Sequence, residues 1–359
     1  MKTRYYGWAC LALGSLPALA LAQSSVTLYG VADVSLRYLN AATPHGGSQW
    51  QLTNGAITQS RWGLLGSEDL GGGLAAIFRL ESGFNLPNGT ESNTGVLFNR
   101  FAYVGLASRT YGTLTLGQQN NPVYEYLIEG WDPLTVGNYK QNAWLPIAFS
   151  GFLRGENNTA MYRYRNGALS VSAAYGFGNV TGNFANGSMK GFAVAYDPSP
   201  LGAEAGYTES YNATGQKQTE YNVQLRYRLG APEFWLGYYH STDETGSVDA
   251  FLNGNTAIPN AISPRKDNAF VAGGAYQFTP ALRWTNAFYY DSATHVLSAA
   301  GSAGDGKRYA FVTLLEYSLS KRTTIYATAD FNRVTGAAAS ELPNRTYQIG
   351  AGTGLRVRF

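Results

Sequence analysis

The last thirteen residues, from Tyr347 to Phe359, alternate between two kinds of side chain. One parity is apolar apart from Thr353 and ends on Phe359, while the other carries Gln348, three glycines and two arginines. A period of two indicates a β-strand with one apolar face and one polar face. An apolar face that runs to a terminal aromatic residue is hard to explain in water. In a membrane-spanning barrel that face meets lipid and the polar face meets a water-filled lumen.

The same alternation recurs in about sixteen segments after Gln23, separated in turn by tight turns and longer loops. Short turns that alternate with longer loops are expected when the two ends of a barrel face different compartments. A secreted, soluble all-β protein has little reason to keep its short turns at one end. We therefore predict an all-β fold, a sixteen-stranded antiparallel transmembrane β-barrel over residues 23–359, with the soluble protein as the alternative. The predicted strands are residues 26–38, 59–68, 74–85, 99–107, 113–119, 158–166, 168–177, 188–197, 203–211, 219–229, 233–242, 268–278, 282–292, 308–319, 324–334 and 347–359.

The longest stretch without alternation runs from Asn120 to Glu156. It contains three prolines, several aromatic residues and the acids Glu125, Glu129 and Asp132. A long connection inside a compact fold is either disordered or functional, and this one is too aromatic for a disordered tether. We predict a functional loop.

The first residues have the features of a secretory signal peptide. Lys2 and Arg4 precede an apolar run, and an A-x-A site at residues 20–22 predicts cleavage after residue 22. The single cysteine, Cys10, leaves with this segment, so the mature chain has no thiol chemistry. Loss of the two cations reduces the formal charge from +3 to +1, which gives nucleic-acid binding no electrostatic support.

Six features of the chain occur in a fixed order along it: S-S-V-T-L-Y-G-V-A-D (24–33), S-R-W-G-L-L-G-S-E-D-L-G-G-G-L (60–74), A-Y-V-G-L (102–106), Y-G-T-L-T-L-G (111–117), Y-S-L-S-K-R-T (317–323) and the terminal Phe359. Together they resemble the general porins of Gram-negative bacteria, most closely the beta-proteobacterial type. The resemblance implies an outer-membrane homotrimer of sixteen-stranded barrels, surrounded by lipid and lipopolysaccharide. It also implies that the third external loop, here Asn120–Glu156, folds into the lumen, and that the barrel assembly machinery reads Phe359 as an assembly signal.

Two positions depart from the family pattern. Leu65 stands where a basic residue is expected, and Ala76 stands where the family often has lysine. Both positions fall on or near the expected pore wall. The usual charge arrangement of the family is therefore not assumed for this chain.

Alternation also predicts which charged side chains face the lumen, because a charge on the lipid face costs roughly 2–4 kcal/mol near the bilayer midplane. Charges that line a pore decide which ions enter it. We predict a field across the narrowest point, with a slight preference for anions. The alternative is that the arginines are paired near the rim or stabilise the loop. The predicted basic wall is Arg37, Arg61, Arg79 and Arg163, opposed by the loop acids Glu125, Glu129 and Asp132.

The predicted function is passive diffusion of small hydrophilic solutes and ions, with no cofactor, metal or catalytic residue. His45, His240 and His295 lack metal-binding spacing, and no G-x-S-x-G pattern is present. One alternative is a porin that prefers a particular substrate. Another is a surface adhesin or receptor barrel that acts through the external loops. Those loops are predicted at Asn40–Gly55, Asp243–Lys266 and Ala293–Gly306.

Overall fold

The computed structural model describes residues 24–43, 45–150, 156–254, 257–298, 301–343 and 346–359. The predicted signal peptide, residues 1–22, lies outside these ranges.

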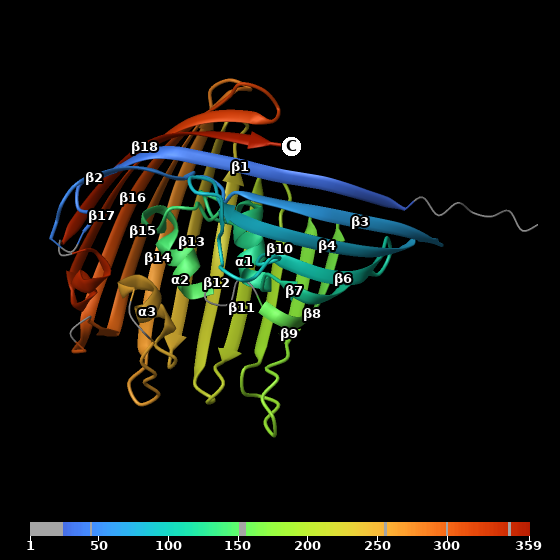
Figure 1. Cartoon of the computed structure of the whole chain (residues 1–359), viewed down its shortest axis with the longest axis horizontal. Coiled ribbons are helices and arrows are strands. Elements are labelled where there is room, and N and C mark those ends of the chain that lie inside the picture. The colour runs from blue at the N-terminus through green and yellow to red at the C-terminus, as the bar shows by residue number, and fades with distance from the viewer. Residues whose placement is uncertain (1–23, 44, 151–155, 255–256, 299–300, 344–345) are drawn as a thin grey trace, which may run out of the picture.

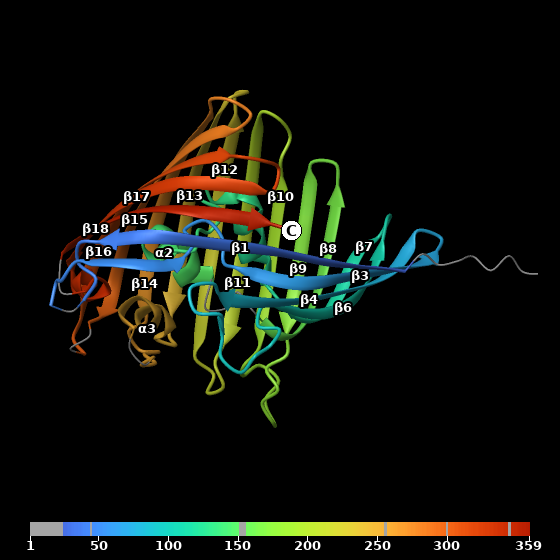
Figure 2. The same cartoon turned by 45° about the horizontal axis from the view of Figure 1, so that its top comes forward.

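The described residues form a β-barrel that encloses short helices (Figures 1 and 2). The strands are β1 (Ser25–Leu39), β2 (Gln49–Asn54), β3 (Arg61–Gly71), β4 (Leu74–Asn85), β5 (Thr90–Glu91), β6 (Phe101–Ser108), β7 (Gly112–Gln119), β8 (Glu156–Asn166), β9 (Leu169–Gly176), β10 (Met189–Tyr196), β11 (Leu201–Tyr211), β12 (Lys217–Arg228), β13 (Pro232–Asp243), β14 (Arg265–Gln277), β15 (Leu282–Leu297), β16 (Ala303–Ser318), β17 (Thr323–Gly336) and β18 (Tyr347–Arg358). The helices are α1 (Pro122–Tyr126), the π-helix η1 (Leu127–Trp131), α2 (Lys140–Ser150), α3 (Ser247–Asn253) and the 3-10 helix η2 (Ala337–Glu341).

These strands fill sixteen positions around the barrel. β3 pairs with the first half of β1 and β2 with the second half, so the two are pieces of one barrel strand that is interrupted at residues 55–60. β5 has two residues and pairs with β4 alone. β1 pairs with β18 from Val31↔Arg358 to Leu39↔Gly350, which closes the barrel. The predicted sixteen-stranded antiparallel barrel is confirmed.

The barrel exposes apolar side chains and buries polar ones. In β17 the exposed positions are apolar from Ile325 to Phe331, and the positions between them, such as Asp330 and Asn332, are buried and polar. A closed sheet leaves no unpaired edge, and its apolar exterior suits lipid rather than water. None of the described helices is long and apolar enough to cross a membrane.

A row of aromatic rings crosses the outer face of five consecutive strands, β12 to β16. Their ring centroids are 6.3, 5.2, 6.4 and 5.1 Å apart from one strand to the next. Aromatic rings gather where hydrocarbon meets the polar headgroups, so the row marks a membrane interface. The rings belong to Tyr221, Tyr238, Phe270, Tyr290 and Tyr309.

The external loops contain more structure than the sequence pattern predicted. The loop predicted at Asn40–Gly55 contains β2, and the loop predicted at Asp243–Lys266 contains α3. The loop predicted at Ala293–Gly306 is shorter, because β15 continues to Leu297 and β16 begins at Ala303. These elements are short and depend on pairing or packing with distant residues, so the local sequence carries little signal for them.

Arg265 joins two external loops to the inner wall. Its guanidinium lies 2.7 Å from Asp249 of α3, 2.7 Å from Asp267 of its own strand and 3.1 Å from Glu341 of η2, with Asp291 of β15 at 3.6 Å. All five side chains are buried. Because a buried carboxylate needs a cation or hydrogen-bond donors nearby, this one guanidinium fixes the positions of α3 and η2.

Replacement of Arg265 by methionine is expected to release α3 and η2, because it leaves four buried carboxylates without this cation. Removing one partner of a buried pair costs about 3–5 kcal/mol. Proteinase K should cut the Arg265→Met variant near α3 and η2 faster than the wild type, and the urea midpoint should fall. The matched control is Arg333→Met, which removes an exposed arginine at the external end of β17. Equal cleavage rates in both variants would show that other contacts hold the loops.

Candidate functional site

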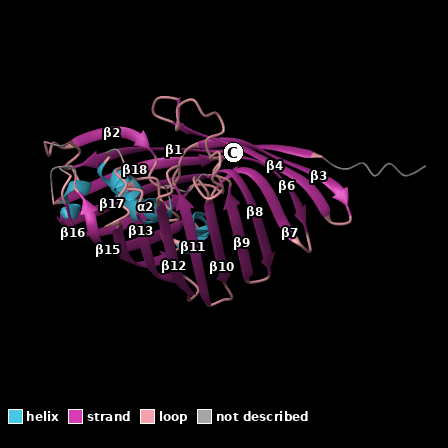
Figure 3. Cartoon of the chain, turned by 90° about the horizontal axis from the view of Figure 1, so that it is seen from below, coloured by secondary structure: helices cyan, strands magenta, loops and turns pink. Residues whose placement is uncertain are grey.

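The third external loop connects β7 to β8, and we term its described residues, 120–150, loop 3. Its first helix, α1, is capped by Asn121, whose side-chain oxygen accepts a hydrogen bond from the backbone N–H of Tyr124 at 2.9 Å. Pro122 occupies the first helical turn, where its missing N–H is not needed. The chain leaves η1 through Gly130, at φ +104°, a conformation that favours glycine. Local signals therefore explain how loop 3 begins and turns. The helices lie within the curve of the strands in Figure 3.

Two polar contacts attach loop 3 to the inner wall. The carbonyl oxygen of Gly130 accepts hydrogen bonds from Arg226 Nη1 at 2.9 Å and from Trp235 Nε1 at 3.0 Å. Asp132 Oδ1 accepts a hydrogen bond from the Tyr289 hydroxyl at 2.8 Å. Loop 3 is thus bonded to β12, β13 and β15 through side chains that point inward.

The Asp132 carboxyl is buried and accepts hydrogen bonds from the backbone. It is fully buried, and its Oδ2 accepts hydrogen bonds from the backbone N–H groups of Leu134 and Val136 at 3.1 and 2.9 Å. These bonds favour the charged form, but burial outweighs them and raises the pKa of Asp132 to about 6.

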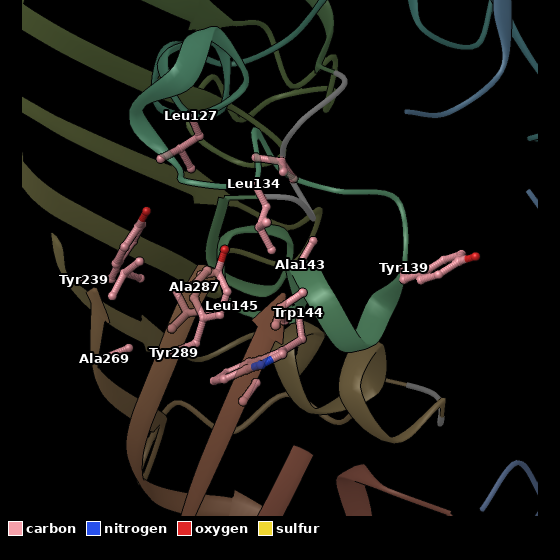
Figure 4. Close-up of a cluster of buried hydrophobic side chains, with 14 of the residues drawn as sticks. Leu127, Leu134, Tyr139, Ala143, Trp144, Leu145, Tyr239, Ala269, Ala287 and Tyr289 are labelled. Atoms are coloured by element: carbon pink, nitrogen blue, oxygen red, sulfur yellow. The ribbon is translucent and has the colours of Figure 1, made fainter. Parts of the chain in front are cut away.

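Apolar side chains of loop 3 fill one half of the barrel interior. Leu134, Trp144 and Leu145 are buried against the inward-facing Tyr239 and Tyr289 (Figure 4). The same cluster reaches inward-facing side chains on β14, β16 and β17. Close packing of this kind leaves no water-filled space where this cluster meets the wall.

The segment between β2 and β3, residues 55–60, contacts loop 3 from the opposite side of the lumen. The backbone and side-chain N–H groups of Asn138 donate to the carbonyl oxygens of Ala56 and Gly55, at 2.8 and 2.9 Å. Asp33 holds the interrupted segment in place by accepting hydrogen bonds from the Tyr326 hydroxyl at 2.7 Å and the Thr58 N–H at 3.0 Å. Loop 3 is therefore fixed at both sides of the lumen.

A cavity of about 540 Å³ remains between loop 3 and the inner faces of β3, β4, β6, β7 and β8. Six arginines but only two acidic residues, Glu125 and Glu129, line it. A second cavity of about 260 Å³ adjoins the first, since they share Ile57, Thr135, Arg356 and Arg358, and it adds the acids Asp132, Glu233 and Glu316. We call the two cavities together the passage. The arginines of the first cavity are Arg61, Arg79, Arg100, Arg163, Arg356 and Arg358, and the second adds Arg226 and Arg283.

Three arginines surround one carboxylate at the wall of this passage. Glu81 is fully buried and lies 2.6 Å from Arg100, 2.7 Å from Arg79 and 3.6 Å from Arg61. It also accepts a hydrogen bond from the Tyr29 hydroxyl at 2.6 Å. One negative charge cannot neutralise three guanidinium groups, so this cluster keeps an excess of positive charge next to the passage.

Two of the three acids of loop 3 are neutralised by arginines of β8. Glu125 lies 2.7 Å from Arg163, and Glu129 lies 2.7 Å from Arg165. On β18, Arg356 lies 3.1 Å from Glu316, whereas Arg358 forms no ion pair with any described residue. Arg358 lines both cavities and therefore adds an unneutralised cation to the passage.

The structure separates the seven side chains predicted for the pore into two groups. Arg61, Arg79, Arg163, Glu125 and Glu129 line the first cavity. Arg37 is buried beneath loop 3, whereas Asp132, itself a residue of loop 3, is buried but borders the second cavity.

Arg37 does not reach the passage. Its guanidinium lies 2.8 Å from Asp330 and 3.9 Å from the centre of the Tyr139 ring, and its side chain is 2% exposed. Its position matches the alternative in which an arginine supports the loop.

The predicted basic wall omitted five of the eight lining arginines, namely Arg100, Arg356 and Arg358 in the first cavity and Arg226 and Arg283 in the second. Alternation along the last strand already placed Arg356 and Arg358 on the polar face. Alternation does not show, however, that loop 3 leaves this part of the inner barrel wall uncovered. Arg100 falls within the predicted strand 99–107, but on the same parity as Val104 and Leu106, whose side chains face outward, and β6 itself begins only at Phe101.

The histidines do not form a reactive site. His240 lies on the outer face, stacked on Tyr221 at 4.9 Å. Nowhere in the described ranges do three or more His, Cys, Asp or Glu side chains gather as metal ligands would.

The fold and the passage define a transmembrane β-barrel channel. The family model described as Gram-negative porin matches residues 8–337, and the chain belongs to that family. It is an outer-membrane porin of the beta-proteobacterial type, a channel rather than an enzyme. An outer membrane porin protein of Bordetella pertussis is 27% identical, over 98% of each chain.

Two solved structures share the fold. An anion-selective porin from Comamonas acidovorans superposes with a TM-score of 0.77 at 22% identity, over 94% of this chain and all of that one. OmpT of Vibrio cholerae, solved in a trimer form, has a TM-score of 0.65 at 14% identity, over 94% of this chain and 99% of that one.

Replacement of Asp132 by asparagine is expected to remove a pH dependence of stability. The carboxyl has a pKa of about 6 when folded and an ordinary value of 3.8, so between these values the folded chain holds the proton more tightly than the unfolded chain. The contribution is complete below pH 3.8 and is lost as the pH rises through about 6, by about 3 kcal/mol in total.

Urea midpoints in detergent at pH 4 and pH 7.5 measure this effect. The difference between the two midpoints should be smaller in Asp132→Asn than in the wild type. Asp305→Asn, which changes an exposed acid, should behave as the wild type does. An Asp132→Asn variant that keeps the full wild-type difference would contradict the assignment.

Proposed function

We propose that this porin passes small hydrophilic solutes and ions by passive diffusion and prefers anions. The observation that carries the proposal is the excess of arginine along one passage, where eight arginines and five acidic residues line the two cavities. A pore lined by one sign of charge concentrates ions of the opposite sign. No cofactor or energy source takes part.

The pairing of the acids supports the preference. Glu125 and Glu129 each have an arginine partner, and Glu81 is buried among three arginines. A passing cation therefore meets carboxylates that are already neutralised, whereas a passing anion meets Arg61 and Arg358. The Comamonas porin of the same fold is anion-selective, which agrees with this direction.

In this proposal the predicted residues have two roles. Arg61, Arg79, Arg163, Glu125 and Glu129 line the pore and set its field. Arg37 holds loop 3 in place and acts on conduction only through its position, whereas Asp132 both anchors loop 3 through Tyr289 and borders the second cavity. The three arginines Arg100, Arg356 and Arg358 join the pore-lining group.

The proposed assembly is a homotrimer. The outer faces of β6 and β7 expose only aliphatic side chains, in contrast to the aromatic row on β12–β16. A smooth aliphatic surface suits permanent contact with another protein chain, and aromatic rings suit the lipid interface. The trimer form of OmpT is a precedent within the same fold. The aliphatic residues are Val104, Leu106, Leu114 and Leu116.

Targeting and assembly complete the proposal. Residues 1–22 are a signal peptide that is removed on export, and residues 23–359 form the mature barrel. The barrel assembly machinery recognises Phe359, which exchanges backbone hydrogen bonds with Gly30 at 3.0 and 3.1 Å and remains half exposed. Outer-membrane lipid and lipopolysaccharide surround the apolar exterior.

Joint replacement of Arg61 and Arg358 by glutamine should weaken the preference for anions. In a planar bilayer under a KCl gradient, the wild-type reversal potential should have the sign of an anion-preferring pore, and the variant should move toward the cation side. A unit charge about 6 Å away in water changes the local anion occupancy about threefold.

The matched control is Arg333→Gln, on the outer face of β17, which should leave the potential unchanged. An unshifted potential in the double variant would show that these arginines do not set selectivity. Folded wild-type protein that carries no current would instead favour the receptor alternative.

Native mass spectrometry of protein extracted from the outer membrane tests cleavage and assembly together. The intact complex should have the mass of three chains that each begin at Gln23, because the signal peptide is removed and the aliphatic faces associate. Leu106→Glu, which puts a charge on that face, should reduce the share of trimer, while Leu236→Glu, on the exposed face of β13, should reduce it less. A monomer mass from the wild type would contradict the assembly.

A further inference from the structure

A pair of carboxylates lies on the inner wall behind α1, away from the passage. Glu204 on β11 and Glu220 on β12 are 2% and 1% exposed, and they are close enough to repel one another. Neither has a cationic partner among the described residues, and both oxygens of Glu220 lack a hydrogen-bond partner. Burying a carboxylate without a cation or hydrogen-bond donors costs free energy, so a further group must bind to these oxygens.

Unpaired oxygen atoms of neighbouring side chains surround this pair. The strand register places Glu204 opposite Gln224, and it places Glu220 between Thr208 and Ser241. All of these side chains are buried and point toward the interior. The oxygens without a partner are Glu204 Oε1, Thr208 Oγ1, Glu220 Oε1 and Oε2, Asn222 Oδ1, Gln224 Oε1 and Ser241 Oγ.

Two of these oxygens converge above a glycine. A Cβ atom added at Gly206 would lie 2.7 Å from Asn222 Oδ1 and 3.3 Å from Glu204 Oε1. The same point would lie 2.7 Å from Val123 Cγ2, which belongs to α1 and closes the space from the lumen. The cluster is therefore rich in acceptors and covered by loop 3. Its donors among the described residues are the Asn222 amide, which donates to Glu204 Oε2 at 2.7 Å, and the hydroxyls of Thr208 and Ser241 beside Glu220, too few for the seven unpaired oxygens.

We propose that this cluster binds a divalent cation of the hard, oxygen-preferring class, with Ca²⁺ as the natural occupant. Ca²⁺ takes six to eight oxygen ligands from carboxylates, amide carbonyls, hydroxyls and water. Two carboxylates neutralise its charge, and the cluster contains no nitrogen or sulfur ligand that would favour a softer metal. The bound cation links β11, β12 and β13 beneath α1 and so fixes that part of the wall under loop 3.

Calcium titration of the full-length protein in detergent, after treatment with EDTA, tests the site. The wild type should bind a single Ca²⁺ per chain by calorimetry. Tb³⁺ should replace it with luminescence excited through Tyr239, whose hydroxyl accepts a hydrogen bond from Gln224 at 2.9 Å. Joint replacement Glu204→Gln and Glu220→Gln should abolish both signals. The control Glu209→Gln, which changes an acid on the outer face of β11 paired with Lys190, should keep them.

A second measurement uses the single variant Glu220→Gln, which keeps the volume of the side chain. Loss of one carboxylate should weaken Ca²⁺ binding at least about tenfold and reduce the rise in unfolding temperature that Ca²⁺ gives the wild type. No binding by the wild type, or equal binding by the double variant, would overturn the proposal and show that protons and water satisfy these oxygens. The site lies outside the passage, so the reversal potential tests the anion preference separately.

Discussion

The packing of loop 3 against the inner wall of β13–β17 decides where this barrel stays open. That sector has apolar side chains on its inner face, such as Val271 and Val312, so it can bury Trp144 and Leu145 of the loop in a dry core. The sector from β3 to β8 presents arginines instead, as do positions on β12, β15 and β18. Guanidinium groups cannot be buried against an apolar loop without partners, so these positions border the passage. The inner wall thus packs as a core where its side chains are apolar and borders the passage where they are cationic.

The charges of the passage matter through their positions rather than their sum. The whole chain carries a formal charge of only +3, and composition alone predicts almost no selectivity. Local pairing changes this result, because Arg163 and Arg165 neutralise Glu125 and Glu129, two of the three acids of loop 3. The cations that remain, including Arg358, then face the solute without a counter-charge. A field of this kind acts over a few ångströms, within the range where salt screens weakly.

Sequence alone could predict the strands, because period-two alternation is a local signal that each segment carries by itself. It could also place Arg61, Arg79 and Arg163 on the inner face. It could not separate them from Arg37, because the partner of Arg37 is Asp330, on a strand at the far end of the chain. The same limit explains the missed helices of loop 3 and the missed β2, which are stabilised by contacts with distant parts of the chain. Long-range packing decides which inward side chains meet solvent.

The arginines of this barrel divide into two physical classes. Arg37 and Arg265 are fully buried in ion pairs, and such pairs add little net stability compared with apolar side chains of similar volume. Their effect is to exclude other arrangements, since any shift of loop 3, α3 or η2 would leave a buried charge without its partner. Arg61 and Arg358 line the first cavity and form no ion pair with the described residues of loop 3. Substitution in the second class can therefore alter selectivity while the first class preserves the shape of the passage, which explains how one fold accommodates pores of different charge.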